Sequence, residues 1–81
     1  MNIEIYTTPT CIWCKTAKEY FDSKGIEYKE YDVTEDDEKA LEMVEKSGQR
    51  GVPVIDIDGN IIIGFDKDAI EELLEELIED E

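Results

Sequence analysis

Both cysteines of the chain lie in the stretch TTPTCIWCKTAK, residues 7–18, and they are three positions apart. Ahead of this stretch, Ile3 and Ile5 alternate with polar residues, which indicates a short strand that runs into a turn. From Cys11 onward the apolar residues recur at helical spacing, and Gly25 is placed to end that helix. The residues expected on its buried face are Trp13, Ala17, Tyr20 and Phe21. The cysteines are thus predicted at the N-terminal end of a helix that follows a strand.

The middle of the chain predicts a second strand and a second helix. The strand is expected within residues 26–33, with a slip in its apolar alternation between Tyr28 and Tyr31. Thr34 is expected to be the N-cap of the helix, because the acidic residues that follow it favour the positive end of a helix dipole. The pair Ser47-Gly48 is expected to end this helix.

The last third of the chain predicts a β-hairpin and a third helix. The hairpin strands are residues 54–57 and 60–63, and they turn at Asp58-Gly59, where both positions must tolerate positive φ. Asp66 is expected to cap the helix, and residues 79–81 are expected to fray. The apolar face of this helix is formed by Ile70, Leu73, Leu74, Leu77 and Ile78.

The predicted order of elements is therefore β-α-β-α-β-β-α. A strand, a crossover helix and a second strand form a parallel βαβ unit, and the hairpin extends the same sheet. This order predicts an α/β fold with helices on the faces of the sheet. We expect one domain over residues 1–81, because a core of this size leaves no apolar surface for a second one.

Charge and composition exclude several classes of function. The chain has 23 acidic and 8 basic residues, a net charge of −15, and no histidine. Nucleic acid is not an expected ligand, because a phosphate backbone is bound through clustered Lys and Arg. A Cys-His protease and a Cys2His2 zinc site both require histidine.

The longest aliphatic run, residues 61–63, is far shorter than the about 20 residues that cross a bilayer, and residues 1–5 lack a basic leader. We expect a cytoplasmic protein that does not enter the membrane.

The predicted position of the cysteines favours a reactive pair. Backbone N–H groups and the positive end of the helix dipole would stabilise the Cys11 thiolate, and Lys15 and Lys18 would add positive charge. Cys14 lies one turn further on, within reach of a disulfide. A purely structural disulfide is disfavoured, because so short a loop constrains the unfolded chain least. A structural zinc site needs four ligands, and one chain offers two thiolates and no imidazole. A dimer that shares a metal cluster could supply the missing ligands. Disulfide exchange is therefore the predicted chemistry.

Three motifs together resemble the glutaredoxin family, and in particular the short glutaredoxin-like proteins of bacteria and archaea that grade into the NrdH redoxins. The motifs are TTPTCIWCKTAK at residues 7–18, GVPV at residues 51–54 and GFD at residues 64–66. The resemblance covers nearly the whole chain. It implies a thioredoxin-like fold, in which a four-stranded mixed sheet is flanked by three helices.

The resemblance also implies roles for the residues of the site. Cys11 would be the attacking thiol and Cys14 the resolving thiol. Pro53 would be the cis-proline that faces them, and it would leave the Val52 backbone free to pair with a bound peptide or with glutathione.

The remaining candidate residues for binding substrate or glutathione each have a second interpretation. Trp13 is either a substrate contact or a core anchor of its helix. Arg50 is either an anion contact or a solvated loop residue. Gly64, Phe65 and Asp66 stand where glutaredoxins carry paired glycines and the acid that meets the glutathione amine, yet Asp66 is also explained as a helix cap.

The resulting hypothesis is a monomeric thiol:disulfide oxidoreductase that reduces protein or glutathione mixed disulfides and binds no metal or cofactor tightly. Its reductant is either glutathione or thioredoxin reductase, since Thr8 replaces the usual carboxylate-binding lysine and Phe65 resembles the NrdH redoxins. Ile12 replaces the usual proline. That change supports an alternative, a homodimer that holds a [2Fe-2S] cluster through Cys11 and external glutathione. A redox-sensing binding module with a dedicated protein partner is a further alternative.

Overall fold

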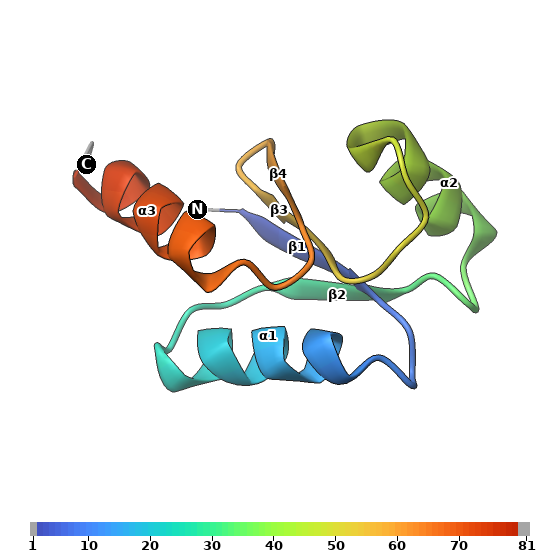
Figure 1. The fold of residues 1–81 in the computed structure, drawn as a ribbon, viewed down its shortest axis with the longest axis horizontal. Helices are drawn as coiled ribbons and strands as arrows, with labels where there is room; N and C mark the ends of the chain where they lie inside the picture. The colour runs from blue at the N-terminus through green and yellow to red at the C-terminus, as the bar shows by residue number, and fades with distance from the viewer. Residues whose placement is uncertain (1, 80–81) are drawn as a thin grey trace.

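The computed structural model of the chain describes residues 2–79 and has the element order that the sequence predicts (Figure 1). Its elements are β1 (Ile3–Thr7), α1 (Ile12–Ser23), β2 (Lys29–Asp32), α2 (Asp37–Ser47), β3 (Val54–Ile57), β4 (Asn60–Ile63) and α3 (Lys67–Glu79). The fold is a thioredoxin-like α/β fold, as expected.

The four strands form one mixed sheet in the order β2-β1-β3-β4. β1 pairs parallel with β2 and antiparallel with β3, and β3 pairs antiparallel with β4. The carboxyl ends of β1, β2 and β4 and the amino end of β3 therefore lie together. We call this end of the sheet the site edge, and its strand residues are Thr7, Asp32, Val54 and Ile63.

Helices cover both faces of the sheet. On one face, α1 and α3 pack on Ile3 and Ile5 of β1 and on the alternate residues of β3, with Phe21 fully buried among them. On the other face, α2 packs Met43 against Tyr6 and Val54. The middle strands are consequently buried on both sides, whereas the sequence alternation of β1 indicated only one buried face. No helix in residues 2–79 is long and apolar enough to cross a membrane.

Two predicted boundaries in the middle of the chain are wrong. Ile26 belongs to the C-terminal turn of α1, where its N–H donates to the Phe21 carbonyl at 3.0 Å, so β2 is shorter than residues 26–33. The slip in alternation has a simple cause: Tyr28 packs on the α1 side of the sheet and Tyr31 on the α2 side. Residues three apart in an extended chain point to opposite faces.

The N-cap of α2 is Asp36 rather than Thr34. The Asp36 carboxylate accepts a hydrogen bond from the Lys39 N–H at 3.1 Å, as an N-cap does. Thr34 is held in the preceding turn instead, where its N–H donates to the Asp32 carboxylate at 2.9 Å. Because the Asp32 carboxylate holds Thr34 in this turn, the helix begins two residues later than predicted.

The predicted hairpin and the predicted cap of α3 are confirmed. Asp58 and Gly59 both have positive φ, 50° and 91°, and the Gly59 N–H donates to Asp56. The Asp66 carboxylate accepts from the Ala69 N–H at 3.2 Å and caps α3. The predictions for the Ile78 side chain and for Asp80 and Glu81 lie outside the described residues.

Candidate active site

The two cysteines form a disulfide at the start of α1, on the site edge. Cys11 is the N-cap of the helix, with extended backbone angles, and its Sγ accepts a hydrogen bond from the Cys14 N–H at 3.1 Å. The Cα atoms of the pair are 5.2 Å apart. One helical turn therefore brings both sulfurs together, as the sequence predicted, and a backbone N–H points at the Cys11 sulfur.

The two sulfur positions differ in their access to solvent. Cys14 is 1% exposed and belongs to the buried face of α1, whereas Cys11 is partly exposed. Between them, Ile12 and Trp13 are 77% and 61% exposed. Two large apolar side chains are thus exposed to solvent next to Cys11.

The expectation that Trp13 belongs to the buried face of α1 is wrong. The buried residues of this helix are Cys14, Ala17 and Phe21. The helix begins at Ile12, so its inward stripe starts with Cys14, which lies three residues before Ala17 and occupies the place assigned to Trp13. The core-anchor interpretation of Trp13 therefore fails, and its role as a substrate contact stays a prediction.

The GVPV and GFD motifs meet at the site edge. The Val52–Pro53 peptide bond is cis, and Pro53 is buried. The Pro53 carbonyl accepts from the Gly64 N–H at 2.8 Å, which joins the two loops. Gly64 has a φ of 77°, a left-handed conformation that favours glycine. The contact follows from the predicted hairpin, because Val54 pairs with Ile63 and the next residues outward are Pro53 and Gly64.

The other predicted binding residues lie in different environments. Phe65 is partly buried, and its ring packs edge-on against Tyr20 with centroids 5.7 Å apart. Asp66 is exposed and caps α3. Arg50 is exposed and lines an apolar hollow beside α2, together with Val33 and Leu41. Phe65 therefore lies toward the core between α1 and α3, while Arg50 lies on the opposite face of the sheet.

The positive charge expected near the cysteines is smaller than the sequence suggested. Lys15 is exposed, but the Lys18 amine pairs with the Glu30 carboxylate of β2 at 2.8 Å. Glu30 also accepts from the Thr7 hydroxyl at 3.0 Å. The first turn of α1 itself contains no acidic residue. The one hydrogen bond to the Cys11 sulfur within residues 2–79 comes from the Cys14 N–H at the helix N-terminus, which favours a thiolate there.

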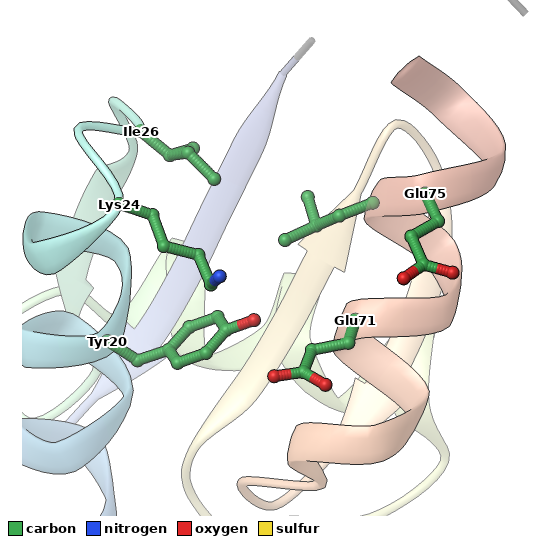
Figure 2. Close-up of a pocket in the computed structure, with 6 residues that line it drawn as sticks. Tyr20, Lys24, Ile26, Glu71 and Glu75 are labelled. Atoms are coloured by element: carbon green, nitrogen blue, oxygen red, sulfur yellow. The ribbon is translucent and has the colours of Figure 1, made fainter. Parts of the chain in front are cut away.

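A hollow lies between α1 and α3 and is lined on the α1 side by residues from the end of that helix, the opposite end from Cys11 (Figure 2). Tyr20 and Lys24 face Glu71 and Glu75 across it, and Leu74 and Ile26 complete its lining. Burial raises the pKa of Tyr20, and the nearby Glu71 carboxylate raises it further. The Tyr20 hydroxyl is buried without a hydrogen-bond partner in the described part of the chain. The hollow is separate from the cysteines.

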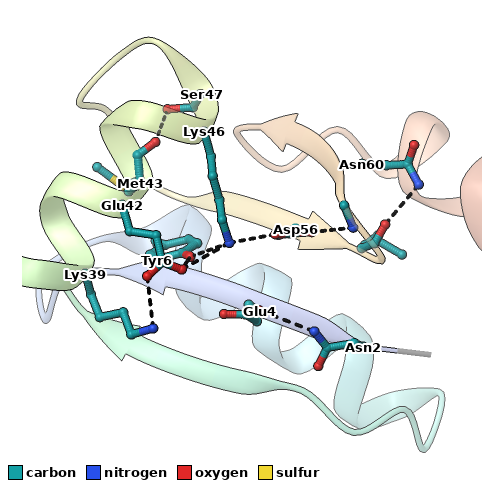
Figure 3. Close-up of polar contacts among 12 residues, drawn as sticks. Asn2, Glu4, Tyr6, Lys39, Glu42, Met43, Lys46, Ser47, Asp56 and Asn60 are labelled. Atoms are coloured by element: carbon teal, nitrogen blue, oxygen red, sulfur yellow. Dashed lines mark hydrogen bonds and ion pairs between the residues drawn. The ribbon is translucent and has the colours of Figure 1, made fainter.

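A polar network that the sequence did not reveal ties α2 to the sheet (Figure 3). The Lys46 amine donates to Asp56 at 2.8 Å and to the Tyr6 hydroxyl at 2.9 Å, and it pairs with Glu42 at 3.1 Å. The Tyr6 hydroxyl in turn donates to Glu42 at 2.6 Å. The only sequence signal was the acidic Asp56 within an otherwise apolar strand. Because Lys46 precedes the loop to Pro53, the network fixes the end of α2 from which that loop departs.

The network shifts the pKa values of its members in consistent directions. Burial, followed by the hydrogen bond to Glu42, raises the pKa of Tyr6 to about 12. Hydrogen bonds from Tyr6, Lys39 and Lys46 lower the pKa of Glu42 to about 2. Burial works to lower the pKa of Lys46, but its hydrogen bonds to Asp56, Tyr6 and Glu42 outweigh burial and raise it. At neutral pH, Glu42 and Lys46 are therefore charged and the Tyr6 hydroxyl keeps its proton.

The fold and the disulfide together define a thioredoxin-fold protein with a Cys-x-x-Cys redox centre. The sequence profile of the glutaredoxin family matches residues 3–62. The chain therefore belongs to the glutaredoxin family, as its motifs indicated.

Two relatives show how far the similarity extends. A glutaredoxin-like 8.6 kDa protein in the rubredoxin operon of Clostridium pasteurianum is 53% identical over 73 residues, which are 90% of this chain and 97% of that protein. Glutaredoxin 3 of Escherichia coli K12 is 42% identical over 65 residues, which are 80% and 78% of the two chains.

The solved structure of NrdH-redoxin from Escherichia coli superposes with a TM-score of 0.77 at 29% identity, covering 90% of this chain and 95% of that one. That glutaredoxin-like protein has a thioredoxin-like activity profile. The chain is thus similar both to a glutaredoxin and to a redoxin. Within residues 2–79, no group of three or more His, Cys, Asp or Glu side chains is arranged to hold a metal ion.

Proposed function

We propose that this protein is a thiol:disulfide oxidoreductase in which Cys11 attacks the substrate disulfide and Cys14 resolves the intermediate. The observation that carries the proposal is the asymmetry of the pair. Cys11 is partly exposed at the helix N-cap with a backbone N–H directed at its sulfur, whereas Cys14 is buried behind it. An incoming disulfide can reach only the first sulfur, and the thiolate form of that sulfur is the stabilised one.

The reaction then follows in two exchange steps. The Cys11 thiolate attacks one sulfur of the substrate disulfide, the substrate S–S bond breaks, and the departing thiolate takes up a proton. Cys14 loses its proton and attacks the mixed disulfide at Cys11, which forms the Cys11–Cys14 bond and releases the second substrate thiol. Two electrons and two protons have then passed from the protein to the substrate.

Backbone and apolar contacts would hold the substrate beside Cys11. The Val52 backbone precedes the cis-proline and makes no hydrogen bond elsewhere in residues 2–79, so it is free to pair with an extended peptide or with glutathione. Trp13 offers an exposed ring next to the cysteines. Arg50, Gly64, Phe65 and Asp66 complete the proposed binding residues.

The electron donor is proposed to be glutathione or thioredoxin reductase. Glutaredoxin 3 among the relatives and NrdH-redoxin among the structures represent the two possibilities. Thr8 replaces the lysine that binds the glutathione carboxylate in many glutaredoxins, so we expect glutathione to be used slowly. The protein would act as a single-domain monomer in the cytoplasm, on disulfides of other proteins.

The test compares both donors on one disulfide substrate, with Cys11→Ser and Cys14→Ser as variants. Cys11→Ser should abolish reduction with either donor, while Cys14→Ser should trap a mixed disulfide and turn over only where free glutathione resolves it. Thr8→Lys should speed the glutathione reaction. An active Cys11→Ser together with an inactive Cys14→Ser would reverse the roles. A brown protein after anaerobic purification, without reductase activity, would instead support the [2Fe-2S] hypothesis.

A further inference from the structure

The loop between α2 and β3 leads into the segment proposed to pair with substrate, and the Gln49 side chain holds its middle. The Gln49 Oε1 atom accepts a hydrogen bond from the Gly51 N–H at 2.7 Å, and the Gln49 Nε2 atom donates to the Gly51 carbonyl at 3.0 Å. One side-chain amide therefore binds both backbone groups of Gly51. A neighbouring antiparallel strand binds a residue through the same two bonds. We call this pair of bonds the amide clamp.

The amide clamp determines the side on which Val52 is open. Because the N–H and the carbonyl of Gly51 reach the same amide, they point to one side of the chain, as they do in an extended strand. Val52 precedes Pro53, a position that favours extended backbone. In an extended chain the backbone groups of the next residue point to the opposite side. The Gln49 amide thus occupies one side of the segment and leaves the Val52 groups on the other.

The segment is tied on both sides of Val52. After it, the Pro53 carbonyl accepts from the Gly64 N–H at 2.8 Å. Before it, the amide clamp starts from a residue that is itself joined to α2, because the hydroxyl of Ser47, the last residue of α2, lies 3.0 Å from the Gln49 carbonyl oxygen and 3.4 Å from its amide nitrogen. The Val52 backbone makes no hydrogen bond within residues 2–79. Its N–H and carbonyl are therefore free, but they are held between two fixed points.

The strand pairing brings this segment beside the loop that carries Cys11. Tyr6 of β1 pairs with Val54 of β3. Two residues further outward, the two chains have reached Thr8 and Val52. The Thr8 carbonyl accepts from the Cys11 N–H at 3.3 Å. The segment with the free backbone groups and the loop with the reactive sulfur thus leave the sheet from neighbouring strands at the site edge.

The amide clamp also explains the glycine at position 51. Gly51 does not have a positive φ, so its backbone conformation does not require glycine. A Cβ atom at this position would lie 2.8 Å from the Gln49 Oε1 atom, which is closer than van der Waals contact. A larger residue there would therefore push the amide away. The glycine leaves the space that the Gln49 amide fills.

We propose that Gln49 is a positioning residue of the site, whose amide takes the place of a neighbouring strand and presents the Val52 backbone to extended polypeptide substrates. This inference rests on the proposed exchange function and adds a residue that favours one substrate class. A disulfide carried by a peptide backbone gains from a pairing partner that is already ordered. A disulfide without amide groups has nothing to pair with Val52. The two exchange steps at Cys11 and Cys14 are unchanged.

The experiment compares two disulfides that differ in their backbone. One is the disulfide dimer of the blocked, uncharged peptide acetyl-Ala-Cys-Ala-amide, and the other is bis(2-hydroxyethyl) disulfide, which has no amide group. The protein is reduced with dithiothreitol, desalted and mixed with each disulfide, so that a single turnover is measured without an external donor. Acid quenching, alkylation and mass spectrometry give the second-order rate constant of Cys11–Cys14 oxidation. The rate constant for the peptide is divided by that for the hydroxyethyl disulfide, so a change in the reactivity of Cys11 cancels.

Two variants reach the amide clamp from its two sides. Gln49→Met keeps the length of the side chain and removes both hydrogen bonds. Gly51→Ala keeps Gln49 but displaces its amide, and it decides the question if Gln49→Met does not fold. The double variant shows whether both changes act through the same contact.

The control variant is Asn60→Leu. It removes a similar bond from a side-chain amide to the backbone, that of Asn60 to the Ile57 carbonyl at 3.0 Å, at the other end of β3 from Val54. A general effect of losing such a bond should therefore appear in the control as well. Thermal unfolding establishes which variants are folded at the assay temperature.

Gln49→Met should lower the ratio of the two rate constants by about three- to tenfold, the range expected for one hydrogen bond to the substrate. Gly51→Ala should lower it by a similar factor, the double variant should lower it no further, and Asn60→Leu should leave it unchanged. An unchanged ratio in Gln49→Met, an equal fall in the control, or multiplied losses in the double variant would overturn the role of Gln49 alone. If the unaltered protein reacted with neither disulfide, the exchange function itself would be refuted.

Discussion

Replacing Lys46 by Met should destabilise the protein far more than replacing Lys67 by Met. Both changes remove one positive charge and keep an unbranched side chain. Lys46 contacts Asp56, Tyr6 and Glu42 from the end of α2, and the Asp56 side chain is only 8% exposed. Lys67 is 60% exposed and lies 3.9 Å from Glu71. The comparison therefore isolates the polar network from the general effect of net charge.

The expected loss follows from what Lys46→Met leaves behind. The Asp56 carboxylate stays almost fully buried and keeps one of its two hydrogen bonds, the one from the Gly59 N–H at 2.7 Å. Removing one partner of a buried ion pair costs about 3–5 kcal/mol, but Lys46 is 28% exposed, so water can reach the site. We expect a loss of about 2–3 kcal/mol in the free energy of unfolding. For a domain of this size that corresponds to roughly 10–20 °C in Tm. Lys67→Met should cost less than about 0.5 kcal/mol.

Urea denaturation followed by circular dichroism measures both variants in the oxidised state. Adding Asp56→Asn to Lys46→Met should recover part of the loss, because the neutral amide still accepts from Gly59 and no longer buries an unpaired charge. If Lys46→Met and Lys67→Met lie within about 0.5 kcal/mol of each other, the network does not anchor α2. A double variant less stable than Lys46→Met would contradict the assignment of the cost to Asp56.

Four further outcomes are expected. Glu42 has a pKa of about 2 in the folded protein against 4.5 when unperturbed. The stability that it contributes should therefore be complete above about pH 4.5 and lost as the pH falls towards 2. Urea titrations at several pH values should show this slope, and Glu42→Gln should flatten it. Phe21→Ala should cost about 3–5 kcal/mol, measured by the same titration, because Phe21 is fully buried between α1 and the sheet. Asp66→Ala should cost about 1 kcal/mol through the lost cap, whereas Asp66→Asn should cost less. Trp13→Ala should change the free energy of unfolding by less than about 0.5 kcal/mol, because Trp13 is exposed, and it should slow the reduction of a disulfide substrate by the reduced protein. A large loss of stability would show that Trp13 packs in the core.

The sequence by itself determined the features that depend on neighbouring residues. The turn at Asp58-Gly59 follows from the need for two positive φ angles, and the cap at Asp66 follows from its distance to the next N–H groups. The position of Cys11 at a helix start, one turn before Cys14, is equally local. Each of these predictions needed only a few consecutive residues, and each is found in the structure.

Only the tertiary structure decided the features that depend on which segments meet. The burial of β1 on both faces requires α2 to cover the second face. The network of Tyr6, Lys46 and Asp56 joins residues from three elements, so neither its hydrogen bonds nor its pKa shifts leave a periodic signal in the chain.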